Sequence, residues 1–360
     1  MPETTYRNRR AVSIENDRLR VTVTVEGGHI AEILDKASGV NPLWTPPWPS
    51  IEPSSYSREK HPGYGSDSES KLLAGIMGHN LCLDIFGPPS AEEFAAGVCV
   101  HGEGSLASYS IEGEESKLVM RAHLPLAQLD FERRIELASG GFVQIHETAT
   151  NLTALDRPIA WTQHVTLGPP FIRPGVTKLV IPARRSKVYP TSLGPDQHYV
   201  PDAEFEWPHA PNIDGGVTDI DTFPAFERST GVTGHAVDAD RDQAFFIAWE
   251  PSSRLAFGYA WKRTDFPWIS LWEENCARTI PPWNGQTITR GVEFGASPFA
   301  EGRRGMVDRG SLFGVPTYRW LPAKSSVTVD YVAFAFQSGE TPDLLVSALQ
   351  SRGMISAGAL

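Results

Sequence analysis

Two histidines and one glutamate are of types and at positions that could transfer protons. His101 is flanked by small residues, His164 follows Thr162 by two positions in a strand-like run, and Glu293 sits among apolar neighbours in another run. Imidazole and carboxyl groups are the usual general acids and bases of enzymes. A buried carboxyl group needs a partner, and in a cleft it often acts as a base. Each histidine alone also fits a structural role, either in an exposed turn or hydrogen-bonded in the core.

Tryptophans near carboxylates form the second candidate cluster. Trp268, Trp272 and Trp283 lie close in sequence to Glu273 and Glu274. Sugars combine apolar C–H faces with hydroxyl edges, so flat aromatic surfaces beside carboxylates suit them. The alternative is that these tryptophans fill the core of the fold. The further candidates for contact with a ligand are His79, Glu103, Trp272 and Glu273.

Several other chemistries lack their motifs. The sequence contains no His-x-His or His-Glu-x-x-His pattern, no Gly-x-Ser-x-Gly elbow and no glycine-rich phosphate loop. His101 and Glu103 are expected on one face of a strand, but two ligands do not make a metal site. We therefore expect neither a metal nor a cofactor.

The elements that must position these residues read as strands. Apolar residues alternate with polar ones from Leu19 to Val25, which is typical of a half-buried strand. Polar turns separate the runs, and this spacing is typical of a sandwich or barrel. Eleven further runs follow: Ile30–Leu34, Lys117–Leu124, Leu129–Leu137, Phe142–Thr150, Ile159–Leu167, Lys178–Ile181, Ala244–Trp249, Leu255–Trp261, Trp268–Trp272, Thr287–Gly295 and Ser326–Phe336.

Helical signals are few. Ser90 followed by Glu93 has the pattern of a capping box, which predicts a short helix. A C-terminal helix is expected from an N-cap at Thr341 to Leu349. Two long segments, 43–65 and 189–226, look irregular, and loops of that length are usually functional or poorly ordered.

The composition limits which partners the protein can bind and in which cellular compartment it is expected. The chain has 360 residues, 41% of them hydrophobic, and a net charge of −11. The acidic balance argues against nucleic acid and anionic membranes as partners. Three cysteines without a pairing pattern and a polar N-terminus predict a cytoplasmic protein. We expect residues 1–360 to form one domain; the oligomeric state stays open.

Four segments of the sequence resemble those of a known family. The opening strands around Gly27-Gly28, the segment Val100-His101-Gly102, the segment Thr162-Gln163-His164 and the segment Gly291-Val292-Glu293 resemble, in this order, the motifs of the aldose 1-epimerase and galactose mutarotase-like superfamily. Glu103 departs from the pattern, because the family usually has a second glycine there.

The resemblance implies a fold and an activity. The fold is an all-β, large antiparallel sandwich. The activity is an isomerase reaction on a monosaccharide or small carbohydrate, in which Glu293 acts as the base, His164 as the acid and His101 as a sugar-orienting residue. Two alternatives stay open: a non-catalytic sugar-binding protein of the same fold, and a glycoside hydrolase or lyase with Glu273 or Glu274 as a second acid.

Overall fold

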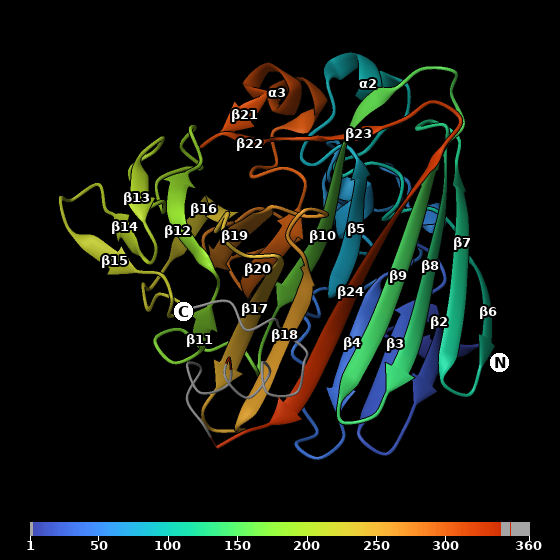
Figure 1. Cartoon of the computed structure of the whole chain (residues 1–360), viewed down its shortest axis with the longest axis horizontal. Helices are drawn as coiled ribbons and strands as arrows, with labels where there is room; N and C mark the ends of the chain where they lie inside the picture. Colours follow the sequence, from blue (N-terminus) through green and yellow to red (C-terminus); the bar gives the residue numbers. More distant parts are fainter. Residues whose placement is uncertain (1–2, 340–345, 347–360) are drawn as a thin grey trace.

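Two large antiparallel sheets make up most of this computed structural model, which describes residues 3–339 and Val346 (Figure 1). In the first sheet the strands run in the order β1 (Thr4–Tyr6), β2 (Arg9–Glu15), β3 (Leu19–Thr24), β4 (Ile30–Asp35), β5 (His79–Asp84), β10 (Arg157–Leu167), β20 (Ile288–Gly295), β19 (Trp268–Asn275), β16 (Ser229–Val237), β12 (Ala183–Val188) and β13 (Glu204–Glu206), and β23 (Arg319–Leu321) pairs with β10.

The second sheet packs against one face of the first (Figure 1). Its order is β11 (Lys178–Val180), β17 (Gln243–Glu250), β18 (Leu255–Lys262), β24 (Ser326–Gln337), β9 (Phe142–Asn151), β8 (Leu129–Ala138), β7 (Lys117–Leu124) and β6 (Ser110–Glu114). Two small hairpins complete the strands: β14 (His209–Pro211) with β15 (Val217–Asp219), and β21 (Ser311–Leu312) with β22 (Val315–Pro316). The all-β sandwich predicted from the sequence is confirmed.

The core lies between the two sheets and is built by alternation along the strands. Trp161 and Val165 of β10 and Phe294 of β20 belong to one cluster with apolar residues of β18 and β24. Successive side chains of a strand point to opposite faces, so His164 and Glu293 point away from this core. The first sheet therefore has a second, partly polar face, on which His164 and Glu293 lie.

Helices are short and few in the described part of the chain. They are α1 (Ser70–Leu73), α2 (Ala91–Ala95) and α3 (Gly302–Arg309), together with the 3₁₀ turns η1 (Pro53–Ser55) and η2 (Pro62–Tyr64). The predicted capping box is present, because Ser90 accepts from the Glu93 backbone and the Glu93 side chain accepts from the Ser90 backbone. No helix in the described ranges has both the length and the apolar character needed to cross a bilayer.

The strand predictions agree with the structure apart from their ends, which shift by a few residues. Several strands were not predicted, among them β2, β5, β12 and β16 of the first sheet and β6 of the second. Segment 189–226 is less irregular than expected, because it contains β13, β14 and β15. The predicted helix from Thr341 to Leu349 lies outside the described residues, apart from Val346, which is buried.

Candidate functional site

A cavity of about 350 Å³ opens on the face of the first sheet that is turned away from the core. This volume is at the lower end of the range for small-molecule sites, about 300–1,000 Å³. Its lining residues are Asp67, Ser68, Glu69, Leu72, Leu73, Ile76, Phe86, Gly87, Pro88, Val100, His101, His164, Tyr189, Leu193, Val232, Ser270, Trp272, Arg278, Trp283, Glu293 and Ala300. A wider hollow on the outer face of the second sheet holds none of the candidate residues.

His164 and Glu293 meet inside this cavity. They come from neighbouring strands, β10 and β20, whose antiparallel register pairs Thr166 with Gly291 and so places His164 opposite Glu293. Nε2 of His164 lies 3.1 Å from Oε1 of Glu293. Nδ1 of His164 lies 3.0 Å from Oγ1 of Thr166, which fixes the orientation of the ring. The imidazole and the carboxyl group are thus held side by side.

Gly291 makes room for the carboxyl group. A Cβ atom at this position would lie 2.5 Å from Oε1 of Glu293 and 3.2 Å from Cβ of Trp272. The first distance is far shorter than any ordinary contact, so any larger residue would displace the carboxyl group. The Gly-Val-Glu segment therefore supplies both the carboxyl group and the space that it occupies.

Burial controls the protonation of the pair. It raises the pKa of Glu293 to about 8 and lowers the pKa of His164 to about 4. Desolvation disfavours the charged form of each group, which moves the two pKa values in opposite directions. The pair therefore binds one proton across the neutral range, and it titrates as a unit because the two groups are in contact.

His101 reaches the cavity from a turn, and this corrects the expectation that it lies on a strand. Its backbone has a positive φ of 67°. Its ring lies 5.1 Å from that of His164, and its Nδ1 accepts a 3.1 Å hydrogen bond from the Gly87 backbone. Burial lowers the pKa of His101, so the ring is neutral at pH 7 and carries its proton on Nε2. His101 can thus donate one hydrogen bond.

Comparisons with known proteins identify the fold. No protein-family model matches the sequence, and no curated protein matches it either. Among solved structures, a candidate aldose 1-epimerase from Klebsiella pneumoniae is similar over 98% of this chain and 85% of its own, with a TM-score of 0.66 and 15% identity. The fold is that of the galactose mutarotase-like proteins.

Two further structures of this kind agree. A candidate aldose 1-epimerase from Escherichia coli K12 has a TM-score of 0.61 at 11% identity and covers 91% of this chain and 99% of its own. A galactose mutarotase-like protein from Lactobacillus casei has a TM-score of 0.55 at 14% identity, over 91% of this chain and 100% of its own. Identities this low establish the mutarotase-like fold alone.

Within the mutarotase-like fold, His79 lies in the core and not in the cavity. It stands on the inner face of β5 and is fully buried. Its Nδ1 lies 3.0 Å from the Tyr259 hydroxyl, and its Nε2 lies 2.8 Å from Oε1 of Gln163. Both ring nitrogens are thus occupied by core partners, so we do not include His79 in the site.

Glu103 and Glu273 also lie outside the cavity. Glu103 accepts a 2.6 Å hydrogen bond from the Ala127 backbone and holds a loop. Glu273 accepts from the Tyr199 hydroxyl at 2.8 Å. Consecutive residues of β19 face opposite sides of the sheet, so Trp272 lines the cavity while Glu273 points into the interior. Of the predicted residues, the structure brings together His164, Glu293, His101 and Trp272.

An arginine that no sequence pattern indicated lies at one side of the cavity. Arg278 follows the end of β19, and its guanidinium lies 4.7 Å from the centre of the Trp283 ring. It also forms ion pairs with Glu69 at 3.3 Å and with Glu274 at 3.5 Å. Arg278 therefore connects the loop after β19 to the α1 segment across the cavity.

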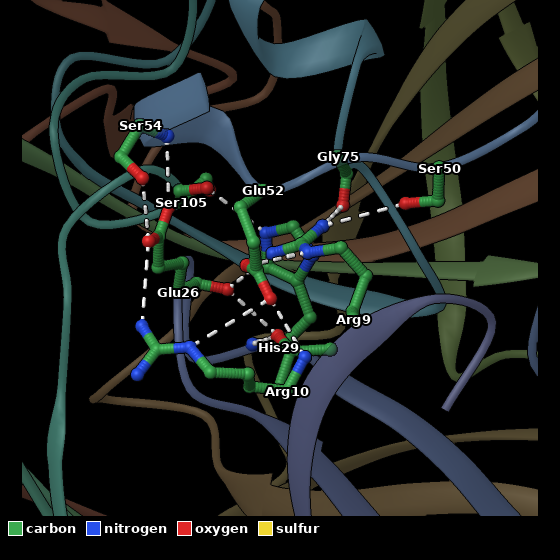
Figure 2. A network of polar contacts seen from close by, with 10 residues as sticks. Arg9, Arg10, Glu26, His29, Ser50, Glu52, Ser54, Gly75 and Ser105 are labelled. Carbon is green, nitrogen blue, oxygen red and sulfur yellow. Dashed lines mark hydrogen bonds and ion pairs between the residues drawn. The ribbon is translucent and has the colours of Figure 1, made fainter. Parts of the chain in front are cut away.

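A buried polar network supports the wall formed by the α1 segment. Figure 2 shows Arg9 of β2 at its centre. Its side chain donates to Glu52 at 2.8 Å, to the Gly75 carbonyl at 2.6 Å and to the Glu26 carbonyl at 2.7 Å. Gly75 follows the C-cap of α1, Ala74, so one buried guanidinium ties this wall to the first sheet. The residues described here contain no group of three His, Cys, Asp or Glu side chains able to hold a metal ion.

Proposed function

We propose that this protein interconverts the anomers of a small sugar by general acid–base catalysis, as an aldose 1-epimerase. One observation carries the proposal: His164 and Glu293 lie 3.1 Å apart in a cavity of about 350 Å³. The mutarotase-like fold supports a sugar as the ligand. Groups whose environments move their pKa values apart are typical acid–base partners.

The reaction needs a base and an acid at one carbon atom. Glu293, as the carboxylate, takes the proton of the anomeric hydroxyl, while His164, as the imidazolium, gives a proton to the ring oxygen. The bond between C1 and the ring oxygen breaks, and the open-chain aldehyde forms. Rotation about C1–C2 followed by the reverse transfers closes the ring as the other anomer. Both oxygens are bonded to C1, so two catalytic groups lying side by side can reach them.

The single proton of the pair must lie on His164 when the step begins. Burial by itself favours the neutral forms, with the proton on Glu293. The 3.1 Å contact provides the path for transfer to His164. Sugar hydroxyls stabilise the resulting charges, and the Nε2–H of His101 can orient a hydroxyl beside them. Each such transfer group typically contributes about 10²–10⁴ in rate.

The hydrolase alternative needs a second carboxyl group near Glu293. The two candidates for it do not line the cavity: Glu273 faces the interior, and Glu274 accepts from the Ala277 and Arg278 backbones and pairs with the Arg278 side chain. Neither is placed to act on a glycosidic bond beside Glu293.

Anomer exchange, followed by NMR or polarimetry over a panel of aldoses, tests the proposal. We expect the protein to accelerate exchange of at least one aldose, Glu293→Gln to abolish the acceleration while the sugar still binds, and His164→Ala to do the same. Glu206→Gln, an exposed change of the same type on β13, should keep full activity. Binding without exchange, or cleavage of oligosaccharides, would overturn the proposal.

A further inference from the structure

Two residues of β19 that line the cavity each carry a buried polar atom without a partner. Ser270 and Trp272 both line it, and their exposed fractions are 1% and 9%. Within residues 3–339 and Val346, neither Oγ of Ser270 nor Nε1 of Trp272 has a hydrogen-bond partner. Buried polar atoms are nearly always paired, so each such exception calls for an explanation. Here both residues belong to the wall of the same small cavity.

Both residues lie beside the catalytic Glu293 side chain. In the ladder between β19 and β20, Ser270 pairs with Glu293 and Trp272 pairs with Gly291. The Glu293 side chain leans over Gly291, towards Trp272. Two positions along a strand are roughly 7 Å apart, a span that one monosaccharide covers. A sugar bound at Glu293 therefore meets both groups.

The chemistry of the two groups narrows what they can bind. An indole N–H only donates, whereas a serine hydroxyl both donates and accepts. A sugar hydroxyl satisfies either one, and the Trp272 and Trp283 rings offer flat surfaces for a C–H face. An apolar ligand would leave both polar atoms unpaired.

Charge argues against a phosphate or carboxylate on that sugar. Asp67 and Glu69 line the cavity, and the guanidinium there, that of Arg278, is already paired with Glu69 and Glu274. An added anion would compete with two carboxylates for one cation. The cavity therefore fits an uncharged ligand.

We infer that Ser270 Oγ and the Trp272 indole N–H bind two hydroxyl groups of an unphosphorylated monosaccharide beside Glu293, and so determine which sugars are accepted. This inference rests on the proposed function for its choice of ligand, and it adds the substrate class and two specificity-determining groups.

The test combines two variants with a set of singly deoxygenated sugars. Ser270→Ala and Trp272→Phe remove the hydrogen bond while keeping most of the packing. For the best sugar, we expect each variant to raise Kd and KM about tenfold, as is typical of one lost hydrogen bond, while kcat changes little. A deoxy sugar that lacks the partner hydroxyl should bind the wild type about tenfold more weakly, with no further loss in the matching variant.

Matched controls separate this from general damage. Ser110→Ala and Trp320→Phe make the same changes at exposed positions away from the cavity and should leave Kd unchanged. If Ser270→Ala fails to fold, Ser270→Cys keeps the volume and serves instead. The inference is overturned if every deoxy sugar loses affinity equally in variant and wild type, or if a hexose 6-phosphate binds more tightly than the hexose.

Failure of the inference and failure of the proposed function are distinguishable. Kd from calorimetry needs no turnover, so the hydroxyl match is tested even if anomer exchange is absent. Exchange that persists with unchanged Kd in both variants overturns the inference and leaves the proposed function standing.

Discussion

Nε2 of His164 lies 3.1 Å from Oε1 of Glu293, and both side chains are almost completely buried at the wall of one cavity. Neither group has its ordinary pKa, because burial favours the neutral form of each and so lowers the pKa of His164 and raises that of Glu293. The pair therefore holds one proton over a wide range, and several measurable consequences depend on that proton and on the geometry around it.

The pH dependence of anomer exchange should be bell-shaped. Below about pH 4 the pair binds a second proton, on His164, so that no group is left to act as base. Above about pH 8 Glu293 loses its proton, so that no group is left to act as acid. We expect kcat/KM to be flat between these limits and to fall tenfold per pH unit outside them. The limbs belong to the pair as a whole. A single limb near the ordinary histidine pKa would contradict this coupling.

Gly291→Ala should impair catalysis while leaving the fold intact. The new Cβ would lie 2.5 Å from Oε1 of Glu293, and the flexible carboxyl end can swing away at low energetic cost. Swinging away breaks the contact with His164, so we expect kcat to fall at least tenfold, towards the range of lost acid–base catalysis. Gly63→Ala, where a Cβ meets no atom within 4 Å, is the control. Unchanged kcat in Gly291→Ala would show that the observed contact is not needed.

Arg9→Met should destabilise the protein strongly. The guanidinium is fully buried, and its loss removes the donor to the Gly75 carbonyl, the ion pair with Glu52 and one of the two donors to the Glu26 carbonyl. We expect the free energy of unfolding to fall by about 3 kcal/mol or more, as for a broken buried ion pair. Arg10→Met removes a half-exposed neighbour whose guanidinium pairs with the carboxylates of Glu26 and Glu52. It should lower the free energy of unfolding by less than about 1 kcal/mol. Equal losses in urea unfolding would refute the role of burial.

His235 should make the free energy of unfolding depend on pH. It is fully buried between Ser186 and Thr233, and burial lowers its pKa to about 3. Below about pH 6.5 this histidine binds a proton in the unfolded chain but stays neutral in the folded chain. This stabilising contribution is thus present above pH 6.5 and is lost as pH falls towards 3, at about 1.4 kcal/mol per pH unit.

His235→Gln should therefore reduce the slope of unfolding free energy against pH by about one proton, whatever its constant effect on stability. Ser186→Ala removes a partner but keeps the imidazole, so it should keep the slope. Identical slopes in wild type and His235→Gln would mean that His235 is protonated in the folded state.

Alternation made most of the fold predictable from the sequence. Strands with one face in the core and one in solvent, such as β7 with its regular exposed and buried pattern, show the period directly. β5 was missed because all six of its residues are buried, which erases the period. β16 was missed because its glycines and small residues carry little pattern.

The site was predictable where it lies on patterned strands. His164 and Glu293 stand on predicted strands, and their meeting follows from the pairing of β10 with β20; their chemical roles remain predictions. Strand parity could have separated Trp272 from Glu273, because neighbours on a strand cannot share a face. Arg278 lies in an unpatterned loop, where only tertiary structure decides which side chains meet.

The double-faced strand β10 has a consequence for how this sequence can vary. Trp161, Gln163 and Val165 are constrained by the interior, whereas Thr162, His164 and Thr166 are constrained by the open face. Adjacent residues of β10 are thus under different selective constraints. A lineage that changes its ligand should drift at every second position of β10 while the positions between stay fixed.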